Sequence, residues 1–414
     1  MIPQGYKQTE VGVIPEDWES VALLSRCDLL NGLTYTPNDM ADNGLLVIRS
    51  SNVQNNQLVF FDNVYVDLTV ADEKLIKKDD IIICVRNGSA ALIGKCAKAS
   101  RDYTITFGAF MAVLRGENNG YIYQLLQQGT IQKHISKNSG ATINQITNGD
   151  FKTIFVPFPT DAKEQERIAG ALSDVDSMIS SLEKLIAKKK AVKQGAMQEL
   201  LTGKKRLPGF TGEWIEKKIE DIVIRFATGL NPRQNFKLNN GGTNYYVTIK
   251  DFREGKLFLD DACDRIDNAA LERINERSDL KKNDLLFSSI GRIGDAYLIT
   301  ETPKNWNINE SVFALRPNQQ IVSPLMLYYL LTSEDVKNKL LDSTTGSTLK
   351  SIKLGHLKEI TCRFPKVIEE QTAIASILSD MDNEIEVLEQ KLAKTRQIKQ
   401  GMMQQLLTGK IRLV

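Results

Sequence analysis

The sequence contains no long apolar run and few residues suited to redox or metal chemistry. No stretch approaches the length needed to cross a bilayer, and the first ten residues, MIPQGYKQTE, lack the basic and then apolar layout of a signal peptide. The five cysteines, Cys27, Cys84, Cys96, Cys263 and Cys362, include no CxxC pair. Such cysteines indicate neither a disulfide framework nor a thiolate metal site. We therefore expect a cytoplasmic protein with no membrane partner, whose thiols are buried.

Catalytic motifs are lacking as well. The two histidines, His134 and His356, lie at non-equivalent places, which argues against a histidine metal site or a catalytic triad. No GxGxxG or GxxxxGK[ST] loop is present to hold a nucleotide. Asp79, Asp80 and Asp284 follow lysine pairs, and we interpret them as turn caps rather than as a two-metal nuclease site. The sequence thus predicts no catalytic group, no metal site and no cofactor of its own.

Composition indicates a globular protein of moderate size. The 414 residues leave room for two to three domains, and 42% apolar and 25% charged residues are typical of soluble proteins. The formal net charge of +2 neither requires nor excludes a nucleic-acid partner, because a near-neutral total can hide a basic face.

A long segment of the chain occurs twice. Residues 164–207 and 370–413, paired at a constant offset of 206 without gaps, are identical at 25 of 44 positions. Unrelated helices of similar composition do not agree so often, so this is an internal duplication.

Each copy is predicted to form one long helix, over residues 161–203 and within residues 367–414. Apolar residues step by three and four in the same register. This seam comprises Ile168, Leu172, Val175, Ile179, Leu182 and Ile186 in the first copy, and Ile374, Leu378, Met381, Ile385, Leu388 and Leu392 in the second. Both helices end at T-G-K, where Gly203 and Gly409 can adopt a left-handed cap. Some 38 helical residues span roughly 57 Å.

Charge favours antiparallel pairing of the two helices. Residues 369–389 carry seven acids and no Lys or Arg, whereas residues 391–414 carry six bases and no acid. The first copy is similarly basic from Lys188 to Arg206, so antiparallel helices place basic halves beside acidic halves. The alternative is that these charges only complement the helix macrodipoles, and the two interpretations are compatible.

The remaining segments, residues 1–160 and 204–366, are predicted to be two copies of one mixed α and β fold. In the first copy, Pro15 and Trp18 introduce a short helix, several strand-like runs follow, and a helix covers about residues 121–137. Trp214 occupies the position in the second segment that Trp18 occupies in the first. The strand-like runs that follow come in the same order in both segments. The expected fold class is therefore α+β, with two similar domains and two long helices in a pseudo-twofold, circular arrangement. The C-terminus should then lie near the segment before Trp18.

Several polar loops carry residue types suited to DNA. Arg can fork onto guanine, Asn or Gln can pair with adenine, and Lys, Ser and Thr suit phosphates. The candidates are Arg86, Asn87, Ser89, Lys95, Lys137, Asn138 and Thr142 in the first domain, and Arg233, Gln234, Lys237, Ser288, Arg292, Thr348 and Lys350 in the second. The same residue types occur in any solvated loop, so the set is more informative than its members.

The whole chain resembles the specificity (S) subunits of type I restriction-modification enzymes. The opening YKQTEVGVIPEDW, the two FP…EQ helix starts and the endings KQGAMQELLTGKKRLPGF and KQGMMQQLLTGKIRL carry this resemblance. The helix starts are Phe158, Pro159, Glu164 and Gln165, and Phe364, Pro365, Glu370 and Gln371.

The resemblance implies a non-catalytic subunit that reads double-stranded DNA. Each globular domain would be a target-recognition domain for one half of a split site, and the paired helices would set the spacing and dock two methylation subunits. Restriction subunits would complete the complex. S-adenosylmethionine, ATP and Mg would be bound by these partners. Two alternatives stay open, namely an adaptor with two protein-binding domains on a coiled coil, and an enzyme with an unrecognised site.

Overall fold

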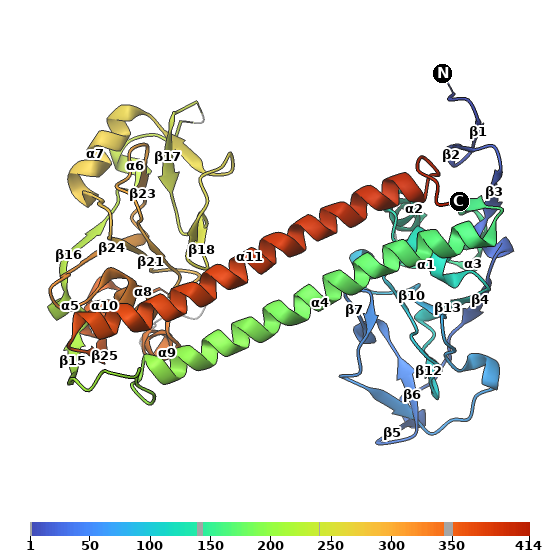
Figure 1. The fold of residues 1–414 in the computed structure, drawn as a ribbon, viewed down its shortest axis with the longest axis horizontal. Helices are drawn as coiled ribbons and strands as arrows, with labels where there is room; N and C mark the ends of the chain where they lie inside the picture. Colours follow the sequence, from blue (N-terminus) through green and yellow to red (C-terminus); the bar gives the residue numbers. More distant parts are fainter. Residues whose placement is uncertain (1, 139–143, 240, 343–350) are drawn as a thin grey trace. The chain divides into compact units, whose positions relative to one another are not determined.

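The computed structural model describes residues 2–138, 144–239, 241–342 and 351–414 (Figure 1). The chain divides into two compact units. Unit 1 comprises Met1–Glu183 and Gln390–Val414, and unit 2 comprises Lys184–Glu389. Each unit therefore contains one globular domain together with part of both long helices, α4 (Ala162–Leu200) and α11 (Ile368–Leu406).

Domain 1, the globular part of unit 1, is built on two four-stranded sheets. The first has the order β11 (Cys96–Lys98), β10 (Ile81–Cys84), β13 (Met111–Arg115) and β4 (Asp28–Asn31), with every neighbouring pair antiparallel. The second has the order β12 (Ile105–Phe107), β6 (Leu45–Ile48), β9 (Val64–Val66) and β5 (Met40–Ala41), with β12 and β6 parallel. Two hairpins, β1 (Tyr6–Thr9) with β2 (Gly12–Pro15) and β7 (Val53–Gln54) with β8 (Gln57–Leu58), stand beside them.

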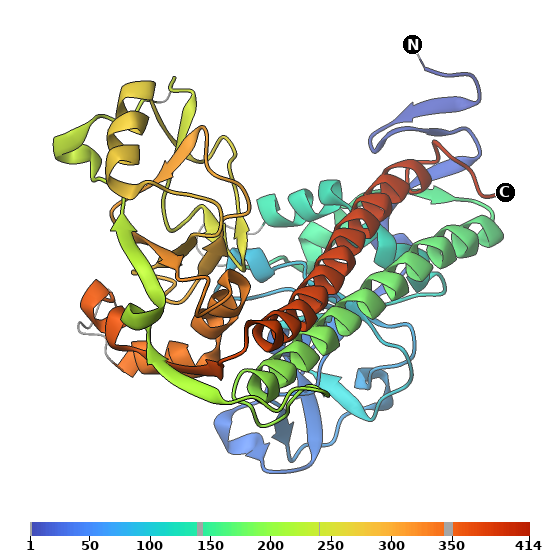
Figure 2. The ribbon, with the colours of Figure 1, turned by 60° about the vertical axis from the view of Figure 1, so that its left-hand side comes forward.

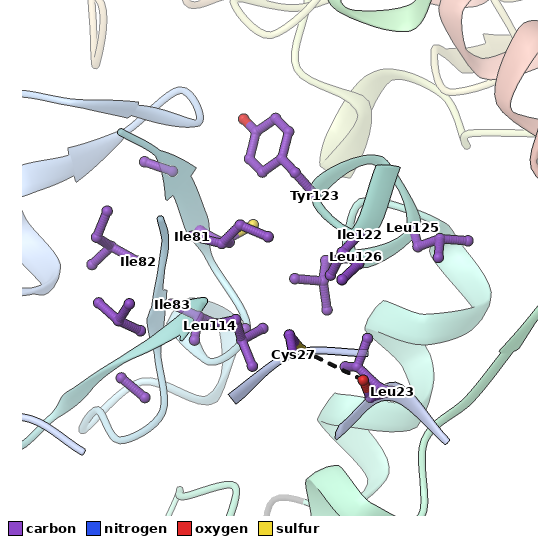
Figure 3. Close-up of a cluster of buried hydrophobic side chains, with 14 of the residues drawn as sticks. Leu23, Cys27, Ile81, Ile82, Ile83, Leu114, Ile122, Tyr123, Leu125 and Leu126 are labelled. Atoms are coloured by element: carbon purple, nitrogen blue, oxygen red, sulfur yellow. Dashed lines mark hydrogen bonds between the residues drawn. The ribbon is translucent and has the colours of Figure 1, made fainter. Parts of the chain in front are cut away.

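The core of domain 1 lies between the first sheet and helix α1 (Asn119–Leu126). Figure 3 shows Ile81, Ile83 and Leu114 of the sheet on the side of Ile122 and Leu126 of the helix, with Ile82 on the other face of β10; all of these side chains are fully buried. Helices α2 (Gly129–Asn138) and α3 (Asn148–Lys152) follow. The helix predicted over residues 121–137 is thus two helices, because the first ends at Leu126.

All five cysteines are free and buried, as predicted. Burial raises the pKa of Cys96 to about 12, so its thiol stays protonated near neutral pH.

The short helix predicted after Pro15 is wrong. Residues Trp18–Ala22 form strand β3, followed only by a single 3-10 turn at Leu23–Ser25. Strand β3 pairs antiparallel with β14 (Phe155–Pro159), which lies more than 130 positions later in the chain. This long-range pairing buries Trp18 completely, and local sequence signals cannot reveal it.

Domain 2, the globular part of unit 2, repeats this topology, except that its second sheet has three strands in the described residues where domain 1 has four. Its first sheet has the order β16 (Val223–Thr228), β24 (Val312–Pro317), β21 (Leu285–Ser288) and β22 (Ala296–Leu298), and its second has β20 (Asp264–Ile266), β17 (Asn244–Val247) and β23 (Trp306–Ile308). Strand β15 (Trp214–Lys218) pairs with β25 (Thr361–Pro365), as β3 pairs with β14. The other elements are α5 (Ile219–Ile222), α6 (Pro232–Asn235), β18 (Phe252–Arg253), β19 (Lys256–Leu257), α7 (Asn268–Ser278), α8 (Pro324–Thr332), α9 (Glu334–Asp342) and α10 (Leu354–Glu359). The prediction of two copies of one mixed fold is confirmed.

The turn aspartates hold the same contacts in both domains. Asp80 accepts a hydrogen bond from the Lys77 backbone N–H at 2.7 Å and from Arg115 at 2.6 Å. Asp284 accepts from the Lys281 backbone N–H and from Arg316, at 2.9 and 2.8 Å. Both carboxylates are buried and committed to these arginines, which supports their interpretation as turn caps.

The two long helices pair antiparallel, as their charges predict (Figure 2). In unit 1, Lys399 pairs with Asp176 at 2.7 Å and Arg396 with Glu183 at 2.6 Å. In unit 2, the residues 206 positions away make the same pairs: Lys193 with Asp382, and Lys190 with Glu389 at 2.7 Å. The twelve predicted seam residues are buried or half-buried in these helices. The same ion pairs therefore hold the helices together in both units.

The last residues of the chain lie against the N-terminal segment, as the circular arrangement predicts. Arg412 pairs with the buried carboxylate of Glu164 at 2.6 Å and with Asp17 at 2.7 Å, and Tyr6 donates a hydrogen bond to the Gly409 carbonyl at 2.9 Å. The hydrogen bond from Arg412 holds the pKa of Asp17 below its usual value, so this pair persists to lower pH than an isolated aspartate would allow. In unit 2, Arg206 makes the equivalent pair with Glu370.

The glycine that ends α11 should be intolerant of a side chain. Gly409 has a φ of +68°, and an added Cβ would lie 2.5 Å from the Pro15 ring, so we expect Gly409→Ala to lower the free energy of unfolding by about 2–3 kcal/mol. Gly203 has a φ of +72° but more room, with Trp214 at 3.3 Å, and Gly203→Ala should cost about 1 kcal/mol. Gly401 lies inside α11 with open space around it, so Gly401→Ala should gain about 0.5–1 kcal/mol. Chemical denaturation of the three variants checks this order, and an equal effect of the first and third would contradict it.

Candidate nucleic-acid interface

In domain 1, four loops that leave the ends of strands come together. We call this surface the loop face of domain 1, formed by residues 33–35, 49–52, 85–89 and 108–110. Leu33 bridges to Gly108, and the Arg86 backbone N–H donates to the Phe110 carbonyl at 3.1 Å. The Asn87 side chain donates to the Ser50 hydroxyl at 2.9 Å. These contacts hold loops that are far apart in the sequence as one surface.

The predicted residues of domain 1 fall partly on this face. Arg86 is exposed, and its guanidinium lies over the Phe110 ring at 5.0 Å from the centroid. Asn87 is half-buried, and its side chain accepts a hydrogen bond from the backbone N–H of the exposed Ser89. Lys95 lies in the turn that leads into β11, outside the four loops. Thr142 lies outside the described residues, as do the side chains of Lys137 and Asn138.

A cavity of about 580 Å³ opens on the loop face of domain 1. Tyr35, Arg49, Ser51, Asp62 and Phe110 are among the residues that line it. None of these residues is among those predicted from the sequence. A comparison of the two repeats could have found Phe110, because the strand registers align it with Ser311 of domain 2 while the adjoining core positions stay apolar.

In domain 2, the corresponding loops carry different side chains. Arg233 and Gln234 lie exposed on α6, and Lys237 lies exposed just after it. The side chain of Asn231 donates to Glu310 at 2.8 Å, which ties the loop before α6 to the loop before β24. These exposed polar side chains can contact a ligand without any rearrangement of the fold.

Two of the predicted residues of domain 2 are engaged inside the protein. Ser288 is fully buried and its hydroxyl donates to the Ile290 carbonyl at 2.9 Å, so its prediction as a DNA contact is wrong. Arg292 pairs with Asp295 at 2.8 Å and donates to the Ile249 and Phe252 carbonyls at 2.7 and 3.1 Å. Arg292 therefore links its own loop to the segment that contains Ile249 and Phe252. Thr348 and Lys350 lie outside the described residues.

Two further hollows lie along the long helices, one in each unit. The first, of about 1020 Å³, is lined by Lys133, Gln400, Gln404, Thr408 and Lys410, among others. The second, of about 340 Å³, is lined by the residues 206 positions away in each case: Lys339, Gln194, Gln198, Thr202 and Lys204. The two helix grooves thus present equivalent side chains.

Within the described part of the chain, no group of three His, Cys, Asp or Glu side chains is placed to hold a metal ion. The helices in that same part include none that is both long and apolar enough to cross a membrane.

Comparison with known proteins identifies relatives along most of the chain. Residues 15–194 and 211–397 each match the family described as type I restriction modification DNA specificity domain. The StySPI specificity subunit of Salmonella potsdam is 28% identical over 264 residues, and the EcoKI specificity subunit of Escherichia coli K12 is 28% identical over 299 residues. These alignments cover 60% and 67% of this chain, but only 56% and 62% of the relatives' lengths. The putative MjaX specificity subunit of Methanocaldococcus jannaschii is 27% identical, over 99% of this chain and 97% of its own.

A solved structure shares the fold. The crystal structure of a type I restriction-modification S subunit from M. genitalium aligns with a TM-score of 0.63 at 17% identity, covering 94% of this chain and 96% of that one.

Two arginines of domain 2 should respond differently to removal. We expect Arg292→Ala to lower the free energy of unfolding by about 1–2 kcal/mol, because two carbonyls and Asp295 lose their donor. The Arg233 side chain makes no hydrogen bond or ion pair with the described residues, so Arg233→Ala should change the free energy of unfolding by less than about 0.5 kcal/mol. If the exposed loops contact DNA, Arg233→Ala should weaken duplex binding by about tenfold while leaving stability almost unchanged. Thermal melts measure the stability of both variants, and titrations with duplex DNA measure their binding. A loss of stability in Arg233→Ala would contradict the interpretation that its side chain makes no contact that stabilises the fold.

Proposed function

This chain belongs to the type I restriction modification DNA specificity family, and we propose that each of its two globular domains reads one half of a bipartite DNA site. The observation that carries the proposal is the duplication of one scaffold with different side chains at equivalent loop positions. The strand registers align Arg49 with Thr248, and Phe110 with Ser311. A pair of like domains that differ where their loops are exposed suits a protein that reads two different half-sites.

The paired helices are proposed to set the spacing between the two half-sites. Each helix has 39 residues, and about 1.5 Å per residue gives roughly 58 Å. Ion pairs at repeated positions fix one register of the two helices, which a spacer of constant length requires.

The helix grooves are the proposed docking places for two methylation subunits. Two surfaces with the same glutamine, threonine and lysine side chains suit two copies of one partner. Gln198 and Gln404 are both exposed and occupy equivalent positions, although exposed positions are free to diverge. Restriction subunits would join this assembly to complete the complex.

We further propose that the chain itself is not catalytic. S-adenosylmethionine, ATP and Mg would then be bound by the partner subunits, and the source of specificity would be separate from the source of chemistry.

Duplex binding tests the DNA-reading function against the adaptor alternative. The full chain should bind duplexes that contain its target, and the binding constant should fall by on the order of 10²–10⁴ between 50 and 200 mM salt, because several phosphate counterions are released. Mapping methylated bases in the source strain with and without this gene gives the target. A protein adaptor would show no sequence-specific binding to duplex DNA, and any weak binding would be the same for every sequence.

A half-length chain, residues 1–208, should dimerise and read a palindrome. In such a dimer, Arg206, Lys193 and Lys190 would face Glu164, Asp176 and Glu183 of the other copy, because these residues replace their equivalents in the ion pairs of the full chain. With the methylation subunit supplied, the dimer should modify a palindrome built from the first half-site and its inverse.

The matched variants of the half-length chain are Lys193→Glu and Lys188→Glu. The first places a negative charge against Asp176 and should weaken dimerisation at least tenfold. The second changes an exposed lysine and should leave dimerisation unchanged. Analytical ultracentrifugation measures both, and a half-length chain that stays monomeric at tens of micromolar would show that the two repeats are not interchangeable.

A further inference from the structure

The cavity on the loop face of domain 1 has the size and the lining of a ligand pocket. Its volume of about 580 Å³ lies within the range of about 300–1,000 Å³ in which proteins hold small ligands. Its lining combines apolar and aromatic side chains, Ile48, Tyr35 and Phe110, with the polar Arg49 and Ser51. Such a mixture suits a flat heterocycle with polar edges better than it suits an ion or a lipid.

Two polar atoms of this lining have no partner. The Arg49 Nε and the Ser51 Oγ are buried, and neither has a hydrogen-bond partner among the described residues. The other end of the Arg49 guanidinium is held, because its Nη2 donates to the Asp62 carboxylate and to the Asp62 carbonyl, both at 2.8 Å. These contacts fix the position of the Arg49 side chain, which remains 35% exposed at the wall of the cavity.

An aromatic ring stands at the same cavity. The Phe110 side chain is 53% exposed, although phenylalanine usually lies buried, and the Arg86 guanidinium lies over it. Exposed rings beside arginines are the surfaces on which unstacked bases lie, since every base has a π face.

Domain 2 is different at the equivalent positions. Thr248, which replaces Arg49, donates its hydroxyl hydrogen to Asp251 at 2.8 Å, and Ser311 replaces Phe110. The scaffold therefore does not need the unmatched arginine or the exposed ring, and both are particular to domain 1.

We propose that this cavity receives one nucleobase turned out of the duplex, so that domain 1 reads part of its half-site from an unstacked base. The base stacks on Phe110, and its polar edge lies against the Arg49 side chain, which is 35% exposed. This inference rests on the proposed function, in which the loop face of domain 1 meets DNA. Turning a base out of the stack costs free energy, which is least where the opposite base is missing or mismatched.

Duplexes with an abasic site test the proposal. The full chain is titrated, without partner subunits, against a set of target duplexes in which the base opposite each half-site position is removed in turn. We expect affinity to rise about tenfold at one position of the half-site read by domain 1 and at no position of the other, because the lost pairing no longer opposes extrusion.

Two variants tie that gain to the cavity. Phe110→Ser introduces the residue of domain 2 at an exposed position and should abolish the tenfold gain. Phe61→Ala is the matched control, since Phe61 is 50% exposed and is not among the residues that line the cavity. It should keep the gain.

The possible failures separate the two proposals. Sequence-specific, salt-dependent binding with no gain at any position, or with equal gains in both half-sites, would overturn the pocket and leave the DNA-reading function standing. A gain that survives Phe110→Ser would also overturn it. The absence of sequence-specific binding to intact duplexes would overturn the DNA-reading function, and the pocket with it.

Discussion

The partly buried ion pairs between the long helices are the interaction on which the other contacts depend. Lys399 pairs with Asp176 in one unit and Lys193 with Asp382 in the other, beside the apolar seam. The side chain of Lys399 is only 10% exposed, so a shift of one heptad that placed it against Ala169 would leave its charge buried without a partner. An apolar seam alone tolerates several registers, whereas these ion pairs favour the observed one. The grooves and the terminal contacts of both units follow from that register.

The two domains share their sheets and differ in their exposed loops. The sheets and their helices keep the same strand order, the same Asp and Arg turn caps and the same pairing of the first and last strands. The loops at the strand ends differ in nearly every exposed side chain. A core tolerates few changes because it is close-packed, while an exposed loop side chain is limited mainly by what it binds.

The sequence revealed the long helices and the duplication because both leave periodic signals. A seam such as Ile168, Leu172 and Val175 repeats every three or four residues, and the copies agree without gaps. The sequence could not reveal strand β3, whose pairing partner lies far along the chain, nor the cavity, whose lining comes from several separate loops. Arg292 and Ser288 were predicted as DNA contacts because their residue types suit DNA. In the fold, their side chains instead donate hydrogen bonds to backbone carbonyls of the protein, which the sequence could not show.

The discontinuity of unit 1 bears on the order in which the chain can fold as it is synthesised. Unit 2 is one uninterrupted segment, Lys184–Glu389, whereas unit 1 needs the last 25 residues, Gln390–Val414. Until those residues leave the ribosome, the carboxylate of Glu164, fully buried in the finished protein, lacks Arg412. The domain that is made first is therefore completed last, and its helix surface stays uncovered while domain 2 closes. During that interval, the nascent chain exposes an apolar seam that a second nascent chain could occupy.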